Sequence, residues 1–198
     1  MTSPEAVPRA AGKDSQKTGA ARWAAASRRR SRHPESKFFP MSFSTVLSVA
    51  SLADLPVVCE LLRAQFAEHS ITLGEARLRA GVEGLLCAPA RGMVLLAKEA
   101  GRSVGIALNV YTWTVEQCGE IAWLEELYVV PDRREAGIGA KLLRHAIEAA
   151  RDRGCLSIDL EVDAGHARAA NLYRRAAFRP LDRKHWTLPL AEPSATAT

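Results

Sequence analysis

The amino-acid sequence predicts one α/β domain with a mixed, mostly antiparallel sheet flanked by helices. Two observations lead to this prediction. Segments with the two-residue alternation of strands are interleaved with segments whose apolar residues recur every three or four positions, as on a helix. In addition, a strand, a helix and a second strand follow one another over residues 121–162, and such a crossover joins parallel strands. One parallel βαβ unit is therefore expected within the sheet.

The N-terminal part of this domain predicts a strand followed by two helices. Residues 44–50 alternate weakly between apolar and polar side chains. In the helix that follows, Pro56 lies in the first turn, where proline is tolerated, so Asp54 is the expected N-cap. Thr72 and Glu75 have the spacing of a capping box. We therefore expect the second helix to be capped by Thr72.

The sequence of the middle of the domain predicts three strands. Residues 93–98 and 104–113 are short apolar runs separated by a turn at Gly101, so they are expected to pair as an antiparallel hairpin. A third strand is expected over residues 121–130. Three strands in a row with short connections indicate an antiparallel core to the sheet.

The C-terminal part predicts the crossover helix and the remaining strands. An amphipathic pattern begins at Ile138 and is stopped by Gly154, which indicates a helix. Residues 155–162 alternate cleanly and predict a strand. A short helix is expected around Leu172, and one or two final strands over residues 178–190.

The turn before the crossover helix carries the pattern Arg134-x-x-Gly137-x-Gly139. Glycines there let a ligand approach the main chain, and the start of a helix adds exposed N–H groups and a positive dipole. Such a loop can cradle a pyrophosphate. A glycine-rich turn that only packs the helix on the strand stays open as an alternative. Neither a P-loop nor a G-x-G-x-x-G motif occurs.

With its neighbours this loop resembles the GNAT family of acyl-CoA-dependent N-acetyltransferases. The run Trp123-Leu-Glu-Glu-Leu-Tyr-Val-Val-Pro131 precedes it, and Asn171-Leu-Tyr-Arg-Arg-Ala-Ala-Phe178 follows it. The resemblance covers most of residues 44–190 and is most specific over 121–178. Within the family, the Leu-Glu-Glu-Leu-Tyr-Val run is similar to the diamine and polyamine N-acetyltransferases. The resemblance implies a GNAT-like fold, in which the parallel βαβ unit carries the acyl-CoA loop, and transfer of an acetyl group from acetyl-CoA to an amine.

The resemblance also implies which residues bind acetyl-CoA, the co-substrate. The backbone of the strand that ends at Val130 would pair with the pantetheine arm, and the loop would hold the pyrophosphate. The expected cofactor-binding residues are Leu127, Val129, Arg134, Ala136, Gly137, Ile138, Gly139 and His166. Three positions depart from the family pattern: Glu135 and Ala177 replace glycines, and His166 replaces an asparagine. Glu135 places a carboxylate near the expected phosphates, which is repulsive unless its side chain turns outward.

Acetylation of an amine requires a base and an acid. An alkylamine has a pKa near that of Lys, about 10.4, so it must lose a proton before or during attack. Glu125 matches the family position of this base and is the first candidate, while Glu126 and Glu120 could act through a water. Glu125 and Glu126 should lie on opposite faces of their strand unless a bulge re-aims one of them. Tyr173 matches the tyrosine beside the CoA sulfur and is the expected acid.

The cysteines and histidines do not indicate metal chemistry or covalent catalysis. Cys59, Cys87, Cys118 and Cys155 have no C-x-x-C spacing, and the five histidines form no metal motif. No metal is therefore expected, and the thiols are expected to be reduced, as in a cytoplasmic protein. Since no cysteine has a recognisable His partner, we expect direct transfer in a ternary complex rather than an acyl-enzyme.

Charge separates the chain into two unlike parts. Residues 1–40 hold nine Lys or Arg against three Asp or Glu, whereas residues 41–198 hold 18 against 19. We expect residues 1–40 to be a disordered basic tail, with a misassigned start and a targeting segment as alternatives. Residues 41–190 form the expected acetyltransferase domain, and residues 191–198 a disordered tail.

The expected partner is a small, cationic primary amine, because three glutamates lie on or near one strand. A peptide or protein amine is an alternative acceptor, and a non-catalytic acyl-CoA-binding module is an alternative function. No membrane contact is expected, because no apolar run approaches the roughly 20 residues of a membrane span. Nucleic-acid binding would rest on the basic tail alone. The resemblance also allows a homodimer.

Overall fold

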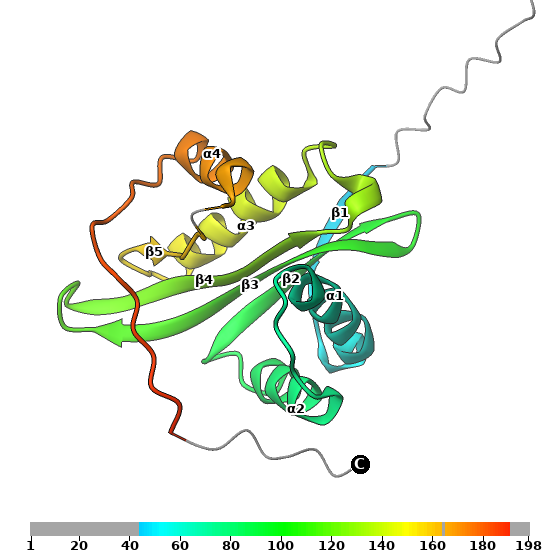
Figure 1. The fold of residues 1–198 in the computed structure, drawn as a ribbon, viewed down its shortest axis with the longest axis horizontal. Helices are drawn as coiled ribbons and strands as arrows, with labels where there is room; N and C mark the ends of the chain where they lie inside the picture. Colours follow the sequence, from blue (N-terminus) through cyan, green and yellow to red (C-terminus); the bar gives the residue numbers. More distant parts are fainter. Residues whose placement is uncertain (1–43, 164, 191–198) are drawn as a thin grey trace, which may run out of the picture. The chain divides into compact units, whose positions relative to one another are not determined.

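The computed structural model describes residues 44–163 and 165–190, which contain five strands and four α-helices (Figure 1). The strands are β1 (Val46–Val49), β2 (Gly92–Glu99), β3 (Arg102–Thr114), β4 (Gly119–Val129) and β5 (Ile158–Asp159). The helices are α1 (Leu55–Glu68), α2 (Glu75–Leu86), α3 (Ile138–Asp152) and α4 (Ala167–Arg175). Two short 3-10 turns, Leu52–Asp54 and Pro131–Arg133, precede α1 and α3.

The five strands form one sheet in the order β1-β2-β3-β4-β5. The first four are antiparallel to their neighbours, and β5 runs parallel to β4. The expected mixed, mostly antiparallel sheet with one parallel βαβ unit is therefore confirmed. The β2–β3 hairpin turns at Ala100 and Gly101, whose φ angles of 47° and 81° lie in the left-handed region. Asp54 is the N-cap residue of α1, as the sequence predicts.

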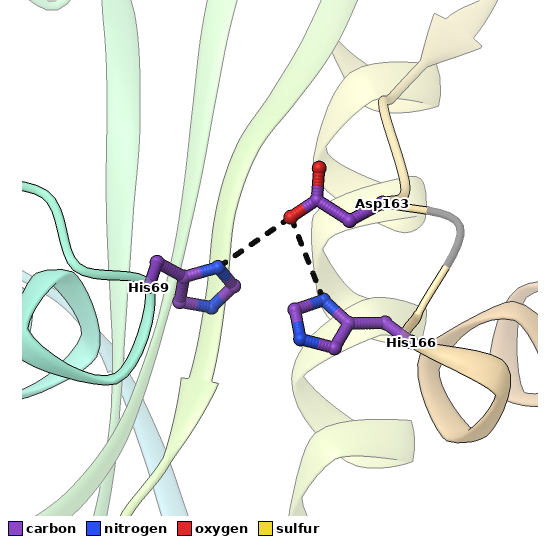
Figure 2. Close-up of side chains that lie close together, drawn as sticks. All are labelled: His69, Asp163 and His166. Carbon is purple, nitrogen blue, oxygen red and sulfur yellow. Dashed lines mark ion pairs between the residues drawn. The ribbon is translucent and has the colours of Figure 1, made fainter.

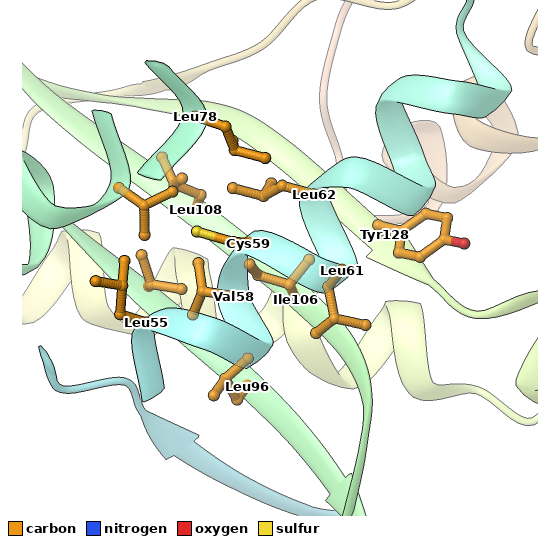
Figure 3. Close-up of a cluster of buried hydrophobic side chains, with 12 residues drawn as sticks. Leu55, Val58, Cys59, Leu61, Leu62, Leu78, Leu96, Ile106, Leu108 and Tyr128 are labelled. Atoms are coloured by element: carbon orange, nitrogen blue, oxygen red, sulfur yellow. The ribbon is translucent and has the colours of Figure 1, made fainter. Parts of the chain in front are cut away.

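Two apolar cores lie on the two faces of the sheet. On one face, α1 and α2 cover residues such as Leu96, Ile106 and Leu108 (Figure 3). On the other face, α3 packs on a second set that includes Val104 and Leu124. Figure 1 shows the corresponding layers, with α1 and α2 on one side of the sheet and α3 and α4 on the other. The chain therefore folds as a three-layer sandwich around β2, β3 and β4.

Three sequence predictions in this region are wrong in detail. Helix α2 begins at Glu75 with Gly74 as its N-cap residue, so Thr72 does not cap it. The strand expected over 155–162 is reduced to the two residues of β5, which pair with Ala122 and Trp123 of β4, and pairing does not continue beyond Trp123.

The third prediction concerns residues 178–190, which form no strand in the described chain. Since β5 is so short, it provides no ladder to which a further strand could add. Large apolar side chains of this segment are consequently exposed, among them Trp186 at 87% and Leu188 at 79%. The tails expected over 1–40 and 191–198 lie outside the described residues.

Among the described residues, none of the helices combines the length and apolar character that crossing a membrane requires.

Candidate active site

The candidate active site is built on a β-bulge in the middle of β4. Leu108 of β3 pairs with Glu126, and the next residue, Asn109, pairs with Leu124. Glu125 is therefore the extra residue of the bulge. Asn109 is buried opposite the bulge, and its side-chain amide donates to the carbonyl oxygen of Ala146 in α3 (2.9 Å). This hydrogen bond fastens α3 to the sheet where the strand is irregular.

Beyond the bulge, one edge of β4 is open. The backbone N–H of Val130 donates to Val104 on β3 (3.0 Å), and alternate residues of a strand face opposite edges. The backbone groups of Leu127 and Val129 therefore point away from β3. On that side β4 pairs with β5 only as far as Trp123. Beyond Trp123 this edge of β4 pairs with no further strand in the described residues, although the Val129 carbonyl accepts a hydrogen bond from Arg134 (2.9 Å). The binding of an extended ligand to Leu127 and Val129 stays a prediction.

The bulge brings both glutamates of the pair into one environment. Glu126 lies on the α1 face of the sheet, where the Gln65 side chain donates a hydrogen bond to its carboxylate. Burial, followed by the negative charge of Glu125, raises the pKa of Glu126 to about 7. Glu125 is more exposed, and desolvation raises its pKa as well. The bulge that re-aims one glutamate is the exception that the sequence analysis allowed.

Tyr173 of α4 belongs to the same environment. Its ring is half-buried and packs edge-on against Phe178, with 5.7 Å between ring centroids. Burial raises the pKa of Tyr173, and the charge of Glu126 raises it further. The phenol therefore stays protonated at neutral pH. The structure thus brings together Glu126 and Tyr173, which two separate sequence patterns singled out, with Glu125 next to Glu126 on β4.

Glu120 does not join them. Its carboxylate accepts two hydrogen bonds from the guanidinium of Arg153, at 2.7 and 3.0 Å. These bonds lower the pKa of Glu120. Glu120 precedes the bulge, near the β3–β4 hairpin, and serves as a structural ion-pair partner there.

The loop between β4 and α3 offers a row of free backbone donors. Among the described residues, the N–H groups of residues 135–140 donate to no backbone carbonyl. The loop includes Ala136, Gly137, Ile138 and Gly139; Gly137 has a φ of 79°, and only the Ile138 side chain is buried. Where left-handed and right-handed backbone conformations alternate, successive N–H groups point to one side. The positive end of the α3 dipole lies at the same place. These residues fit a pyrophosphate, which needs hydrogen-bond donors and no side chain between them.

The guanidinium of Arg134, which precedes this loop, is already hydrogen-bonded to protein groups. Its Nε donates to the carbonyl oxygen of Val129 (2.9 Å), and its Nη2 donates to both oxygens of Glu68 (2.6 and 2.7 Å). Glu68 also accepts a hydrogen bond from the Tyr128 hydroxyl (3.2 Å), and these contacts lower the pKa of the Glu68 carboxyl. Arg134 therefore ties α1 to the end of β4, and the backbone supplies the donors of the loop.

Glu135 turns outward, as phosphate binding requires. Its side chain is 81% exposed and pairs with Arg168 at 3.3 Å. Its φ of 69° lies in the left-handed region, which costs a residue with a side chain roughly 1 kcal/mol. The backbone at this position therefore favours glycine.

Two substitutions separate the effects of charge and backbone at Glu135. Glu135→Gly is expected to raise the free energy of unfolding by up to about 1 kcal/mol and to tighten acetyl-CoA binding. Glu135→Ala removes the same carboxylate but keeps the strained φ, so it should tighten binding without the gain in stability. Thermal unfolding and acetyl-CoA titration measure both quantities. Equal stability of the two variants would contradict this explanation.

His166 is the N-cap residue of α4. Its imidazole faces His69, at the C-terminus of α1, and Asp163. The structure therefore places it beside two residues that the sequence analysis did not connect with it.

Sequence reasoning missed Gln65 and Glu68 at the site. A signal for Gln65 exists, because Val58, Leu61 and Leu62 form the buried stripe of α1 and position 65 continues it by one helical repeat. A polar residue in such a stripe predicts a buried hydrogen bond. Glu68 has no such signal, since an exposed Glu at a helix end is common.

The four cysteines are free, and none of them lies among the residues described at this site. Burial raises the pKa of the Cys59 and Cys155 thiols, which disfavours the nucleophilic thiolate.

Comparison with known proteins agrees with this geometry. The model of the Acetyltransferase (GNAT) family matches residues 55–178. Thialysine N-epsilon-acetyltransferase of Mus musculus is 30% identical over 126 residues, covering 60% of this chain and 72% of the mouse protein. The enzyme of the same name from Sus scrofa is 37% identical over 78 residues, which are 39% of this chain and only 44% of the pig protein.

A solved structure shows the same fold. The aminoglycoside N-acetyltransferase AAC(6')-Iy, crystallised in complex with CoA, superposes with a TM-score of 0.66 and 16% sequence identity. The match covers 77% of this chain and 99% of that structure.

Proposed function

This chain belongs to the acetyltransferase (GNAT) family, and from that premise we propose that it transfers the acetyl group of acetyl-CoA to a primary amine of a small cationic acceptor. The observation that carries the proposal is the half-buried carboxylate of Glu126, whose pKa of about 7 is suited to accepting a proton at neutral pH. The protonated Tyr173 in the same environment supplies the complementary acid.

The donor has a binding surface made mostly of backbone. The free N–H groups of residues 135–140 would hold the pyrophosphate, and the open edge at Leu127 and Val129 would pair with the pantetheine arm. An N–H on this edge near Val129 would donate to the thioester carbonyl as charge develops on its oxygen. When bound, acetyl-CoA supplies an activated acyl group, and the protein positions its carbonyl. The resemblance also implies a contact of His166 with this ligand, but its imidazole faces His69 and Asp163 instead, so we assign it no part in donor binding.

Glu126 would remove the proton of the attacking amine. The pKa of an alkylamine, about 10.4, exceeds that of Glu126 by about 3 units, so a complete transfer before attack is uphill by about 4–5 kcal/mol. We therefore place the proton transfer during attack, as the nitrogen lone pair forms the bond to the carbonyl carbon and the nitrogen becomes acidic. The hydrogen bond from Gln65 holds the carboxylate in place for this step.

Glu125 would bind the acceptor. By its family position Glu125 is the first candidate for the base, and Glu126 is an alternative that would act through a water. The greater exposure of Glu125 favours contact with the positive charge of an incoming acceptor, whereas the burial of Glu126 favours proton transfer. Glu125 would thus bind the cationic acceptor, and Glu126 would accept its proton.

Tyr173 would protonate the leaving thiolate. A thiol with the pKa of cysteine, about 8.5, leaves more easily when an acid donates a proton to the sulfur. Because the base and the acid act on the two substrates at once, no acyl-enzyme is needed. The raised pKa values of Cys59 and Cys155 support this direct route.

A panel of acceptors tests the proposal. We expect the full chain to release CoA thiol from acetyl-CoA only when a cationic primary amine is present. Within a matched series, diamines and polyamines should have lower KM values than a monoamine of the same length, because Glu125 interacts with the additional charge. Amino acids, an aminoglycoside and a lysine peptide complete the panel. Binding of acetyl-CoA without thiol release for any amine would instead support a binding module.

A further inference from the structure

A cluster of metal-binding side chains lies beside the proposed site and takes no part in it. His69 follows the last residue of α1, while Asp163 and His166 belong to the connection between β5 and α4 (Figure 2). One carboxylate oxygen of Asp163 lies 3.7 Å from Nδ1 of His69 and 3.7 Å from Nδ1 of His166. In Figure 2 the two dashed ion pairs, from His69 and from His166, meet at the same oxygen of Asp163. Two chain segments about a hundred residues apart thus meet there.

The contacts within the cluster are too long for hydrogen bonds. At 3.7 Å the Nδ1–oxygen distances exceed the usual hydrogen-bond range of about 2.7–3.2 Å. One potential ligand atom from each side chain can be chosen so that all three lie within 4.8 Å of one another. Around a tetrahedral Zn²⁺, bonds of about 2.0–2.2 Å place neighbouring ligand atoms about 3.4 Å apart. The two Nδ1–oxygen distances of 3.7 Å are close to this spacing, and the remaining separation, within 4.8 Å, would shorten on binding a shared cation.

The local backbone positions the three side chains independently of any metal. The His69 N–H donates to the carbonyl oxygens of Gln65 and Phe66, which fixes the end of α1. The His166 N–H donates to the Asp163 carbonyl (2.9 Å), which closes a tight turn before α4. The two imidazole rings meet edge to face, with 4.9 Å between their centroids. The backbone is thus fixed on both sides of the cluster, while the three side chains themselves are exposed.

From this juxtaposition we propose that His69, Asp163 and His166 form a binding site for a divalent transition-metal ion of the zinc class. Two imidazole nitrogens and one carboxylate oxygen are ligands that such ions prefer, and a water would complete the coordination. This is the one grouping of three such side chains in residues 44–163 and 165–190. The bound ion would connect the end of α1 to the start of α4.

The connection links the elements that carry the proposed catalytic groups. Gln65, Glu68 and His69 lie on one face of α1 and its end, because they are spaced three and four residues apart. Gln65 contacts Glu126, and Glu68 contacts Arg134. Helix α4 carries Tyr173. A metal ion between His69 and His166 would thus fix α1 against α4.

Metal titration of the full chain tests the site. We expect calorimetry to show one high-affinity Zn²⁺ per chain, and Co²⁺ to give the visible absorption of a tetrahedral complex at the same site. His69→Ala and Asp163→Asn should each weaken Zn²⁺ binding by more than about 100-fold, beyond the cost of losing a merely supporting group. His145→Ala is the matched control, because His145 is an exposed helical histidine whose Nδ1 lies near Glu148 instead.

Thermal unfolding supplies a second reading that does not depend on turnover. Zn²⁺ should raise the Tm of the wild type and of His145→Ala, since a ligand that binds only the folded state stabilises it. It should not raise the Tm of His69→Ala or Asp163→Asn, whose metal-free Tm values show whether they fold. Undiminished Zn²⁺ binding in both variants, an equal loss in His145→Ala, or no binding by the wild type would overturn the proposal. None of these results bears on acetyl transfer.

Discussion

Glu126→Gln is expected to lower kcat about 100- to 10,000-fold, the range that a positioned general base contributes. The glutamine side chain can accept the same hydrogen bond from Gln65, so the local geometry should be kept while the proton acceptor is lost. Acetyl-CoA binding should change little, because the donor rests on the loop and on the edge of β4. Initial rates of thiol release at saturating acetyl-CoA measure this effect.

The pH profile identifies the base more sharply than the rate at one pH. In the wild type, kcat should rise with pH through about 7, as Glu126 loses its proton and becomes a base. This rise should be absent from the residual activity of Glu126→Gln. Glu125→Gln is the matched comparison: it should raise the KM for the cationic amine, and it should keep an inflection but move it to lower pH, because the charge of Glu125 is one cause of the raised pKa of Glu126. A greater loss of kcat in Glu125→Gln would assign the base to Glu125.

The pH dependence of the free energy of unfolding reports the pKa of Glu126 without any substrate. Glu126 has a higher pKa in the folded chain than its ordinary value of 4.5, so the folded state binds its proton more tightly. Between about pH 4.5 and 7 this group therefore makes stability fall as the pH rises. Glu126→Gln should abolish this contribution and be more stable than the wild type above pH 7. Thermal unfolding at several pH values tests it, and identical profiles would contradict the raised pKa.

Tyr173→Phe is expected to lower kcat by about two to four orders of magnitude with little change in the affinity for acetyl-CoA, if the phenol donates the proton to the leaving thiolate. Both burial and the charge of Glu126 raise the pKa of Tyr173, so the wild-type phenol keeps its proton across the neutral range. The ring packing against Phe178 is retained in the variant, and stability should therefore change little.

Thioesters that differ in the pKa of their thiol test whether Tyr173 acts as the acid. A thioester whose thiol has a lower pKa should react with Tyr173→Phe almost as fast as with the wild type, because its thiolate leaves without an acid. Tyr111→Phe is the matched control, since Tyr111 stacks on Arg153 (4.0 Å) and is not part of the candidate site. A uniform loss for good and poor leaving groups would contradict the role of Tyr173 as the acid.

Hydrophobic periodicity was sufficient to predict the layers of the fold. The apolar stripe from Leu55 to Leu62 specifies the buried face of α1, and the continuous apolar run of residues 93–98 fits a central strand that is covered on both faces. The last strands failed for a physical reason: residues 155–162 alternate well, but a strand also needs a partner edge, and β4 provides one only at Ala122 and Trp123. Alternation alone cannot show where two neighbouring strands separate.

The candidate site was predictable in its residue types and only partly in its geometry. The loop glycines, Glu125 and Tyr173 are apparent from motif spacing. The position of the bulge is not, because the two consecutive glutamates do not show which residue is the extra one until the register with β3 is known. For the same reason the buried environment of Glu126, and hence its pKa, required the tertiary structure. The side chains that meet from α1 are separated in the chain by about sixty residues or more.

The most direct measurement of acetyl transfer follows both products of one turnover. Full-length protein is mixed with excess diamine and a limiting amount of acetyl-CoA, and free thiol and N-acetylated amine are quantified, with intact mass spectrometry of the protein. The account predicts equal amounts of thiol and acetylated amine, no thiol without the amine, and no acetylated protein intermediate. Thiol released before the amine is added, together with a protein that is one acetyl group heavier, would contradict direct transfer.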